Sequence, residues 1–346
     1  MTSPTLPTTA FTLPPESEAT SPPEARGLAR DGVRLLVARP TGVDHRHFHD
    51  LPDLLEPGDL VVVNTSATRP AAVDVAGSGG RRSIHVATTL DDGAWVVEIR
   101  RPDGRGPDTS YSVGDRLGLP GGVNLELTLS HDGLPATRLW RAAVSPAVDV
   151  DRYLAVYGRP ISYGYLDGRY PLTAYQTVYA TLIGSAEMPS AGRPFTEHLL
   201  VRLMARGITV APVVLHAGVS SPEAHEPPAP ERFDVPAATA RLVASARSVG
   251  TRVIAVGTTV VRALETVADA GGRVRSGAGW TDLVLGPERP ARVVDGLVTG
   301  LHEPRASHLL LLEAVAGPAL VGAAYAAAVD HHYLWHEFGD STLLLP

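Results

Sequence analysis

The chain has 346 residues, 44% of them hydrophobic and 19% charged, and carries a formal net charge of −7. This length and composition indicate a soluble globular protein of two domains. No apolar run approaches the ~18 residues of a membrane helix, and the N-terminus lacks the pattern of a secretory signal. Cysteine is absent, which excludes thiol nucleophiles, disulfides and cysteine-based metal sites. The acidic balance argues mildly against a nucleic-acid surface, and a cytoplasmic enzyme with no membrane partner is expected.

The residue pattern of the first half of the chain changes twice. Residues 1–28 are rich in Pro, Ser, Thr and Glu and predict an extended N-terminal arm. Two strand-like runs, 33–38 and 60–63, flank a connector rich in Asp and His. Residues 73–147 carry short alternating segments, 83–88, 94–99, 123–129 and 137–142, between Gly, Asp and Pro turns. Several short strands at this spacing predict a small inserted antiparallel β-barrel or sandwich.

Helical periodicity returns after Pro146. Residues 196–206 predict an amphipathic helix with Thr196 as its N-cap, and 208–215 predict a buried strand. A helix over 237–249, a strand over 253–256 and helical segments over 308–329 follow. The chain is therefore expected to fold as an α/β (mixed α+β) body, formed by 29–72 and 148–346, with a small antiparallel β-barrel domain inserted at 73–147.

The run Arg252 to Glu265 is the most informative stretch. Four apolar residues, 253–256, predict a buried strand, and Gly257-Thr258-Thr259 then turns the chain into a helix. Free backbone N–H groups at such a helix start bind anions and polar ligand groups. An ordinary βα unit with a threonine cap explains the pattern as well. Arg262 and Glu265, three residues apart on the helix, could also simply pair with each other.

Polar residues gather at the ends of the predicted body strands. In open α/β sheets, ligands bind outside the carboxyl ends of the strands, where loops converge, so a shared cleft is expected. Several of these residues also have a purely structural explanation. His216 could be a core histidine whose ring is fully hydrogen-bonded, Asp295 a turn-forming residue, and Tyr175 and Tyr179 packing residues. The residues at these ends are Tyr175, Gln176, Ser185, Thr196, His216, Thr258, Thr259, Asp295 and His302.

No metal motif, phosphate-binding loop or nucleophile elbow is present. His45, His47 and His49 would share one face of a strand, but alternating histidines without partner carboxylates are a weak metal signal. We expect no metal.

A series of short blocks, however, resembles one family in order along the chain, from about residue 11 to 346. The blocks are Asp50-Leu51-Pro52-Asp53 with Pro57-Gly58-Asp59-Leu60 and Asn64, Tyr175-Gln176-Thr177-Val178-Tyr179-Ala180, Gly184-Ser185, Pro189 with Ala191-Gly192 and Phe195-Thr196, Leu215-His216 with Gly218, Val256-Gly257-Thr258-Thr259 with Arg262, Val294-Asp295-Gly296-Leu297, His302 with Pro304, and Gly339-Asp340. They resemble the S-adenosylmethionine:tRNA ribosyltransferase-isomerase family of queuosine biosynthesis.

This resemblance implies an αβ body with a β-barrel insertion and S-adenosylmethionine as a consumed substrate. Family members transfer and isomerise its ribosyl group onto 7-aminomethyl-7-deazaguanine in tRNA, releasing adenine and methionine. The chemistry needs a base, a general acid and donors that orient the ribose hydroxyls. On this resemblance the catalytic candidates are His216, Glu231 and His302, and the substrate-binding candidates are Asn64, Tyr175, Gln176, Ser185, Thr196, Gly257, Thr258, Thr259, Arg262 and Asp295.

The chain departs from the family pattern in several polar blocks. Asn64-Thr65-Ser66-Ala67 replaces Asn-Asp-Thr-Arg, and Arg193-Pro194-Phe195 replaces Leu-His-Phe. A segment rich in His and Glu survives only as His225, Glu226 and Glu231. Three hypotheses therefore stay open: the family reaction on tRNA, a divergent enzyme that uses S-adenosylmethionine on a small molecule or merely cleaves it, and a catalytically inactive binding protein of the same fold.

Overall fold

The computed structural model describes residues 6–77, 79, 82–104, 106–130, 138–219, 228–304 and 306–346. Within them, the larger of the two main sheets has nine strands, and four neighbouring strands at its centre, β12, β3, β14 and β16, run parallel. In sheet order the strands are β15 (Gly277–Thr281), β13 (Glu231–Val235), β12 (Thr209–Leu215), β3 (Leu60–Asn64), β14 (Val253–Val256), β16 (Gly296–Gly300), β17 (Ser341–Leu344), β1 (Arg34–Arg39) and β2 (Gly42–His47).

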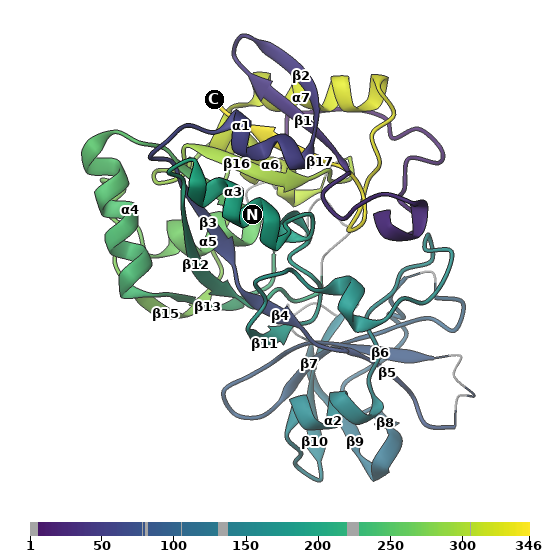
Figure 1. Ribbon diagram of the computed structural model, residues 1–346. Coiled ribbons are helices and arrows are strands. Elements are labelled where there is room, and N and C mark those ends of the chain that lie inside the picture. The colour runs from purple at the N-terminus through teal and green to yellow at the C-terminus, as the bar shows by residue number, and fades with distance from the viewer. Residues whose placement is uncertain are drawn as a thin grey trace.

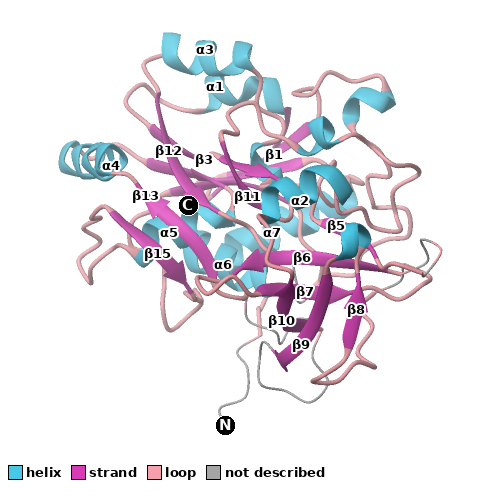
Figure 2. Ribbon diagram, turned by 90° about the horizontal axis from the view of Figure 1, so that it is seen from below, coloured by secondary structure: helices cyan, strands magenta, loops and turns pink. Residues whose placement is uncertain are grey.

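Helices cover both faces of this sheet (Figures 1 and 2). Side chains alternate between the faces along each strand, so Leu60 and Val62 of β3 join one core while Val61 and Val63 join the other. The first core packs under α4 (Ala237–Val249), α5 (Thr258–Thr266), α6 (Ser307–Ala316) and α7 (Pro318–Asp330), and the second under α1 (Leu51–Leu54) and α3 (Glu197–Ala205). Burial on both faces explains the continuous apolar runs of these strands.

A second, antiparallel sheet of six strands projects below the body in Figure 1. Trp95, Trp140 and Ile84 fill its core, and the helix α2 (Val150–Tyr157) packs on it through Tyr153 and Leu154. A short parallel pair, β4 (Ser66–Thr68) with β11 (Leu182–Ser185), lies between the two sheets. The six strands in order are β5 (Ala72–Asp74), β6 (Ser83–Thr89), β7 (Trp95–Ile99), β10 (Leu139–Ser145), β9 (Asn124–Ser130) and β8 (Arg116–Gly118).

The predicted fold class, a mixed α/β body with a curled antiparallel sheet set into the chain, is confirmed. The strand β2 was not predicted. Five of its six residues are exposed, so its sequence shows no alternation of apolar and polar residues. Residues 1–5, Thr137 and the block around His225 and Glu226 fall outside the described residues.

The N-terminal segment is tied to the C-terminal end of the chain. Thr9 donates its backbone N–H and its hydroxyl to Glu313 of α6, both over 2.7 Å, and Phe11 packs against Tyr325 of α7 at 5.0 Å between ring centroids. Single 3₁₀ turns punctuate the loops at Pro23–Arg26, Phe48–Asp50, Pro120–Gly122, Leu172–Tyr175 and Ser190–Gly192. None of the described helices is by itself long and apolar enough to cross a membrane; only α6 and α7 taken together, with a 120° bend between them, meet that criterion.

Candidate active site

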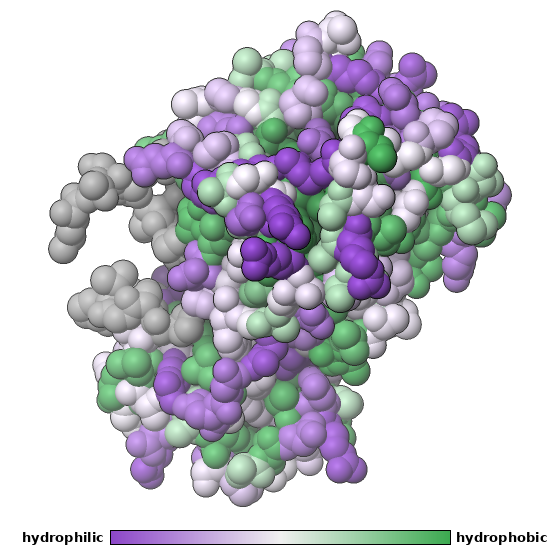
Figure 3. Space-filling view, turned by 90° about the vertical axis from the view of Figure 1, so that its left-hand side faces the viewer, coloured by the Kyte–Doolittle hydropathy of each residue, from purple (hydrophilic) through white to green (hydrophobic). Residues whose placement is uncertain are grey.

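A cavity of about 580 Å³ lies where the carboxyl ends of the central strands face the smaller sheet. The large sheet contributes the segments after β12, β14 and β16, and the smaller sheet contributes residues beside β7 and β10. The face of the molecule in Figure 3 mixes hydrophilic and hydrophobic residues over both parts. The polar and aromatic residues that line the cavity include Glu98, Arg100, Arg138, Tyr163, Tyr165, Tyr175, Glu187, Glu231, Thr258, Thr259, Arg262, Thr299, His302, Glu303, His308, His336 and Glu337.

The turn between β14 and α5 forms one wall. Gly257 has φ = 91°, a backbone conformation that favours glycine, and a Cβ there would come within 3.3 Å of Ala191. No side chain caps the start of α5, so the first backbone N–H groups of this helix have no side-chain acceptor. Thr258 and Thr259, at this helix start, line the cavity. Asn64, at the end of β3, donates to Thr259 Oγ1 over 3.2 Å and to the Leu215 carbonyl over 2.8 Å, which ties this turn to two strands.

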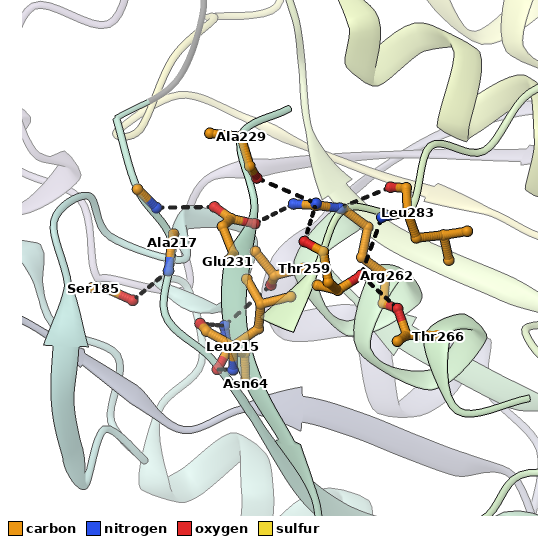
Figure 4. A network of polar contacts seen from close by, with 12 residues as sticks. Asn64, Ser185, Leu215, Ala217, Ala229, Glu231, Thr259, Arg262, Thr266 and Leu283 are labelled. Atoms are coloured by element: carbon orange, nitrogen blue, oxygen red, sulfur yellow. Dashed lines mark hydrogen bonds and ion pairs between the residues drawn. The ribbon is translucent and has the colours of Figure 1, made fainter. Parts of the chain in front are cut away.

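Arg262 and Glu231 form an ion pair on the same wall (Figure 4). The other Glu231 oxygen accepts from the Gly218 N–H over 2.9 Å, and Arg262 also donates to the carbonyls of Thr281 and Leu283. Burial raises the pKa of Glu231. Arg262 and the Gly218 N–H oppose this rise, and the pKa stays above its ordinary value. The cavity wall therefore holds a carboxylate whose charge is balanced by a guanidinium group of α5.

The suggested pairing of Arg262 with Glu265 is wrong. The two side chains leave the helix in different directions, because Arg262 reaches across to β13 while Glu265 turns away from it. Glu265 is fully buried and accepts from Arg289 and from the backbone N–H groups of Arg292 and Val293, the latter two over 2.7 and 2.8 Å.

His302 and His308 form a second group on the cavity wall. Their rings stack with 4.5 Å between centroids and 5° between planes, and His302 Nε2 lies 3.1 Å from Thr299 Oγ1. Burial lowers the pKa of His302 well below its ordinary value, and burial and then Arg262 lower that of His308 to about 4. Both imidazoles are therefore neutral near pH 7, and they can exchange hydrogen bonds with a ligand without carrying charge.

His216 follows β12 and lies beside the cavity, whose wall is formed by the next two residues, Ala217 and Gly218. Its Nδ1 is 2.7 Å from Ser66 Oγ. Burial, and then the charges of Arg69 and Arg232, lower the pKa of His216 to about 4. His216 lies beside the cavity, although its ring does not line it.

Two other predicted residues, Gln176 and Ser185, hold the walls from behind. Gln176 exchanges hydrogen bonds with both backbone groups of Thr68, over 3.0 and 2.7 Å, and Ser185 Oγ accepts from the Ala217 N–H over 3.0 Å. Tyr175 lines the cavity itself, whereas Tyr179 is buried against Phe195 in the second core, with 5.7 Å between ring centroids. Packing thus accounts for Tyr179, whereas Tyr175 both packs against Phe338, at 5.1 Å between ring centroids, and lines the cavity.

Two predicted substrate contacts are misplaced. Asp295 does not line the cavity: it accepts from the Val253 N–H over 2.9 Å at the start of β14, the opposite edge of the sheet from the carboxyl ends. Thr196 is the expected N-cap, and its hydroxyl accepts from the Leu199 N–H over 3.1 Å and donates to Asp31. The N-cap role of Thr196 was predicted correctly, but the side of the sheet on which the Asp295 side chain lies was not.

Sequence reasoning missed an aromatic wall. Tyr165 lies between Tyr163, at 6.0 Å between centroids, and His336, at 4.2 Å, and the two tyrosine hydroxyls donate to Glu187 and Glu337. Tyr163 and Tyr165 lie in the loop before the 3₁₀ turn Leu172–Tyr175, Glu187 follows β11, and His336 and Glu337 precede β17, so none of them belongs to a periodic pattern. Among the described residues, no three His, Asp or Glu side chains gather as metal ligands would.

Comparisons with known proteins agree with this architecture. A sequence profile of the family described as "Queuosine biosynthesis protein" matches residues 7–344. The S-adenosylmethionine:tRNA ribosyltransferase-isomerase of Moorella thermoacetica is 35% identical over 97% of this chain and 98% of its own length. That of Heliobacterium modesticaldum is 36% identical with the same coverage.

The crystal structure of the S-adenosylmethionine tRNA ribosyltransferase from Thermotoga maritima is similar as well. It superposes with a TM-score of 0.53 at 30% identity, over 97% of this chain and 99% of that one. The resemblance inferred from short sequence blocks is thereby confirmed. The chain belongs to the queuosine biosynthesis protein family.

Proposed function

We propose that the chain is an S-adenosylmethionine:tRNA ribosyltransferase-isomerase. It would transfer and isomerise the ribosyl group of S-adenosylmethionine onto 7-aminomethyl-7-deazaguanine in tRNA, with adenine and methionine as the other products. Support comes from relatives of that name matched over 97% of the chain, and from a cavity at the expected edge of the sheet. Because the acceptor is tRNA, we place the enzyme in the cytoplasm.

The charge of the cavity is the observation that carries the substrate assignment. Its described lining contains five carboxylates and three guanidinium groups, and the volume of about 580 Å³ is in the range of small-molecule sites. An excess of carboxylates favours a cation, and the sulfonium and ammonium groups of S-adenosylmethionine give it that character. The carboxylates are Glu98, Glu187, Glu231, Glu303 and Glu337, and the guanidinium groups belong to Arg100, Arg138 and Arg262.

The uncapped start of α5 would hold polar groups of the substrate. The N–H groups of Thr258 and Thr259 stand at the positive end of the helix, and Gly257 allows close approach to the backbone. Asn64 keeps Thr259 in place from behind through its amide N–H. This supports the expectation that these residues bind ribose hydroxyls or another polar group.

Glu231 is the best-placed proton acceptor. The reaction needs a base that removes a proton from the carbon next to the sulfonium, and a donor that assists the departure of adenine. Glu231 lines the cavity, and burial raises its pKa, which makes its carboxylate a stronger base than an exposed one. The neutral imidazole of His302, oriented by Thr299, would serve as a hydrogen-bonding partner of the substrate.

Adenine release tests the proposal directly. Purified protein is incubated with S-adenosylmethionine, with and without tRNA that carries the deazaguanine precursor, and adenine is followed by chromatography. Release only with tRNA supports the proposed reaction. Release without tRNA indicates a different acceptor or simple cleavage, and no release together with no calorimetric binding indicates a fold that has lost this chemistry.

The base is tested with Glu231→Gln, which keeps the shape of the side chain and removes its charge. We expect a fall in turnover of about 10²–10⁴-fold, the usual contribution of a positioned acid or base. Glu126→Gln is the matched control, because that carboxylate is exposed on β9 and pairs only with Arg116 among the described residues. Equal turnover of the two variants would remove Glu231 from the proton transfer.

A further inference from the structure

His216 is clamped by two segments that are far apart in the sequence. Its Nδ1 lies 2.7 Å from Ser66 Oγ at the start of β4. On another side Gly184 of β11 lies so close that a Cβ there would come within 2.3 Å of His216 Nδ1. Only a glycine allows this approach, so the imidazole packs directly against the backbone of β11.

The hydrogen bonds behind His216 form a chain of two serines. The Ala217 N–H donates to Ser185 Oγ over 3.0 Å, Ser185 Oγ lies 2.6 Å from Ser66 Oγ, and Ser66 Oγ lies 2.7 Å from His216 Nδ1. Both serines are buried, with 0% and 1% of their surface exposed for Ser185 and Ser66. Each hydroxyl has a single proton to donate, and His216 Nδ1 either accepts from Ser66 or donates to it, which sets the direction of the chain.

Counting protons decides between the two directions. If Ser185 donates to Ser66, then Ser66 donates to His216 Nδ1, and every proton in the chain has an acceptor. If His216 Nδ1 carries the proton and donates to Ser66 Oγ, either Ser66 donates to Ser185 and the Ser185 proton has no acceptor among the described residues, or Ser185 donates to Ser66 and the Ser66 proton has none. A buried donor without an acceptor is costly, so the first direction is the stable one.

We propose that Ser185 and Ser66 fix His216 as the Nε2–H tautomer, so that His216 acts as a hydrogen-bond donor toward an acceptor oxygen or nitrogen of the substrate. Ser66 and Ser185 are positioning residues in this arrangement. The consequence for the reaction rests on the proposed function, whereas the tautomer does not. The expectation that His216 is the base is replaced, because the Nδ1 lone pair is occupied and Nε2 already carries a proton.

The surroundings of His216 keep its ring neutral. Burial and the cations Arg69, which follows β4, and Arg232, on β13, all disfavour the imidazolium form. Nε2 has no hydrogen-bond partner among the described residues and is not among the fully buried unpartnered atoms. It is therefore accessible to solvent next to Ala217 and Gly218, which line the cavity, although the ring itself is not part of that lining.

The tautomer can be observed directly by two-bond ¹H–¹⁵N correlation spectra of the full-length ¹⁵N-labelled protein without substrate. Among the 13 histidines, His216 is identified as the signal that disappears in His216→Gln. We expect the neutral Nε2–H pattern with no change between pH 5.5 and 8. A protonated ring at pH 7, or the Nδ1–H pattern, in the wild-type protein would overturn the proposal.

Serine variants then test the chain itself. Ser66→Ala removes the donor to Nδ1, and we expect the ratio of Nε2–H to Nδ1–H tautomers to fall about fivefold to tenfold, the factor of one net hydrogen bond. Ser185→Ala should have a smaller effect in the same direction. Ser248→Ala, which removes an exposed hydroxyl on α4, is the matched control and should leave the spectrum unchanged.

The outcomes separate this inference from the proposed function. An unchanged tautomer ratio in Ser66→Ala would overturn the serine chain, even in a protein that releases adenine with tRNA. The expected spectra in a protein that neither binds nor cleaves S-adenosylmethionine would support the tautomer and reject the proposed function and the donor role with it. Expected spectra together with adenine release support both.

Discussion

The ion pair between Arg262 and Glu231 offers a sharp test of how the site wall is stabilised. Only 6% of the Arg262 side chain and 16% of the Glu231 side chain are exposed. Arg262→Met leaves the carboxylate buried without its cation and also removes the bonds to the Thr281 and Leu283 carbonyls, over 3.1 and 3.2 Å. Loss of one partner of a buried pair costs about 3–5 kcal/mol of unfolding free energy.

The size of that loss depends on pH in a defined direction. Without Arg262, the folded-state pKa of Glu231 rises further above the ordinary value of 4.5, because burial is then opposed only by the Gly218 N–H. The folded variant therefore binds more protons than the unfolded chain above pH 4.5, and its stability falls as pH rises. The deficit relative to wild type should be larger at pH 8 than at pH 5.

Urea unfolding of Arg262→Met, Glu231→Leu, the double variant and a control measures the effect. Arg202→Met is the matched control, because Arg202 pairs with Asp53 over 2.9 Å at the surface and its loss should cost less than about 1 kcal/mol. The double variant Arg262→Met with Glu231→Leu removes both charges and should recover part of the loss. A single variant no worse than the control, or a double variant as unstable as the sum of the two singles, would refute the reasoning.

Two further predictions concern the histidines. Gly184→Ala should cost about 1–3 kcal/mol of unfolding free energy and displace His216, since its Cβ would come within 2.3 Å of that ring; Gly164→Ala, with no atom within 4 Å, should be nearly silent in the same urea titration. The pKa of His308 is lowered to about 4 from 6.5, so the unfolded chain takes up this proton first, and the unfolding free energy should fall as pH drops from about 6.5 toward 4. His308→Gln should flatten that slope in urea titrations at pH 7, 6 and 5, and identical slopes would contradict the assignment.

Periodicity predicted four of the nine strands of the body sheet, β1, β3, β12 and β14, and its helices α3 to α7, but not β13, β15, β16 or β17. The strands β3 and β14 are buried on both faces and β12 is buried over its last three residues, so they form continuous apolar runs, and α3 carries a threonine cap that is visible in the sequence. The exposed strand β2 escaped prediction because its pairing depends on the edge of β1 and not on its own side chains. Local sequence patterns therefore suffice to predict an element where its burial requires a regular spacing of apolar residues.

The candidate site was predicted only in part. Gly257, Thr259 and His302 follow strands whose carboxyl ends meet, so the parallel topology was enough to bring them together. Asp295 precedes its strand and lies at the opposite edge. His308 could not be recognised, because an apolar helix sequence gives no sign that its second residue faces a cavity.

The sequence by itself determined the family, the apolar runs that form the central strands, and the loops that carry the site. All three depend on the spacing of residues along the chain. Only the tertiary structure decided partners: Arg262 pairs with Glu231, 31 residues away, and Ser66 with His216, 150 residues away. Hydrogen bonds and ion pairs act over a few ångströms in space, and sequence separation carries no information about which side chains meet at that distance.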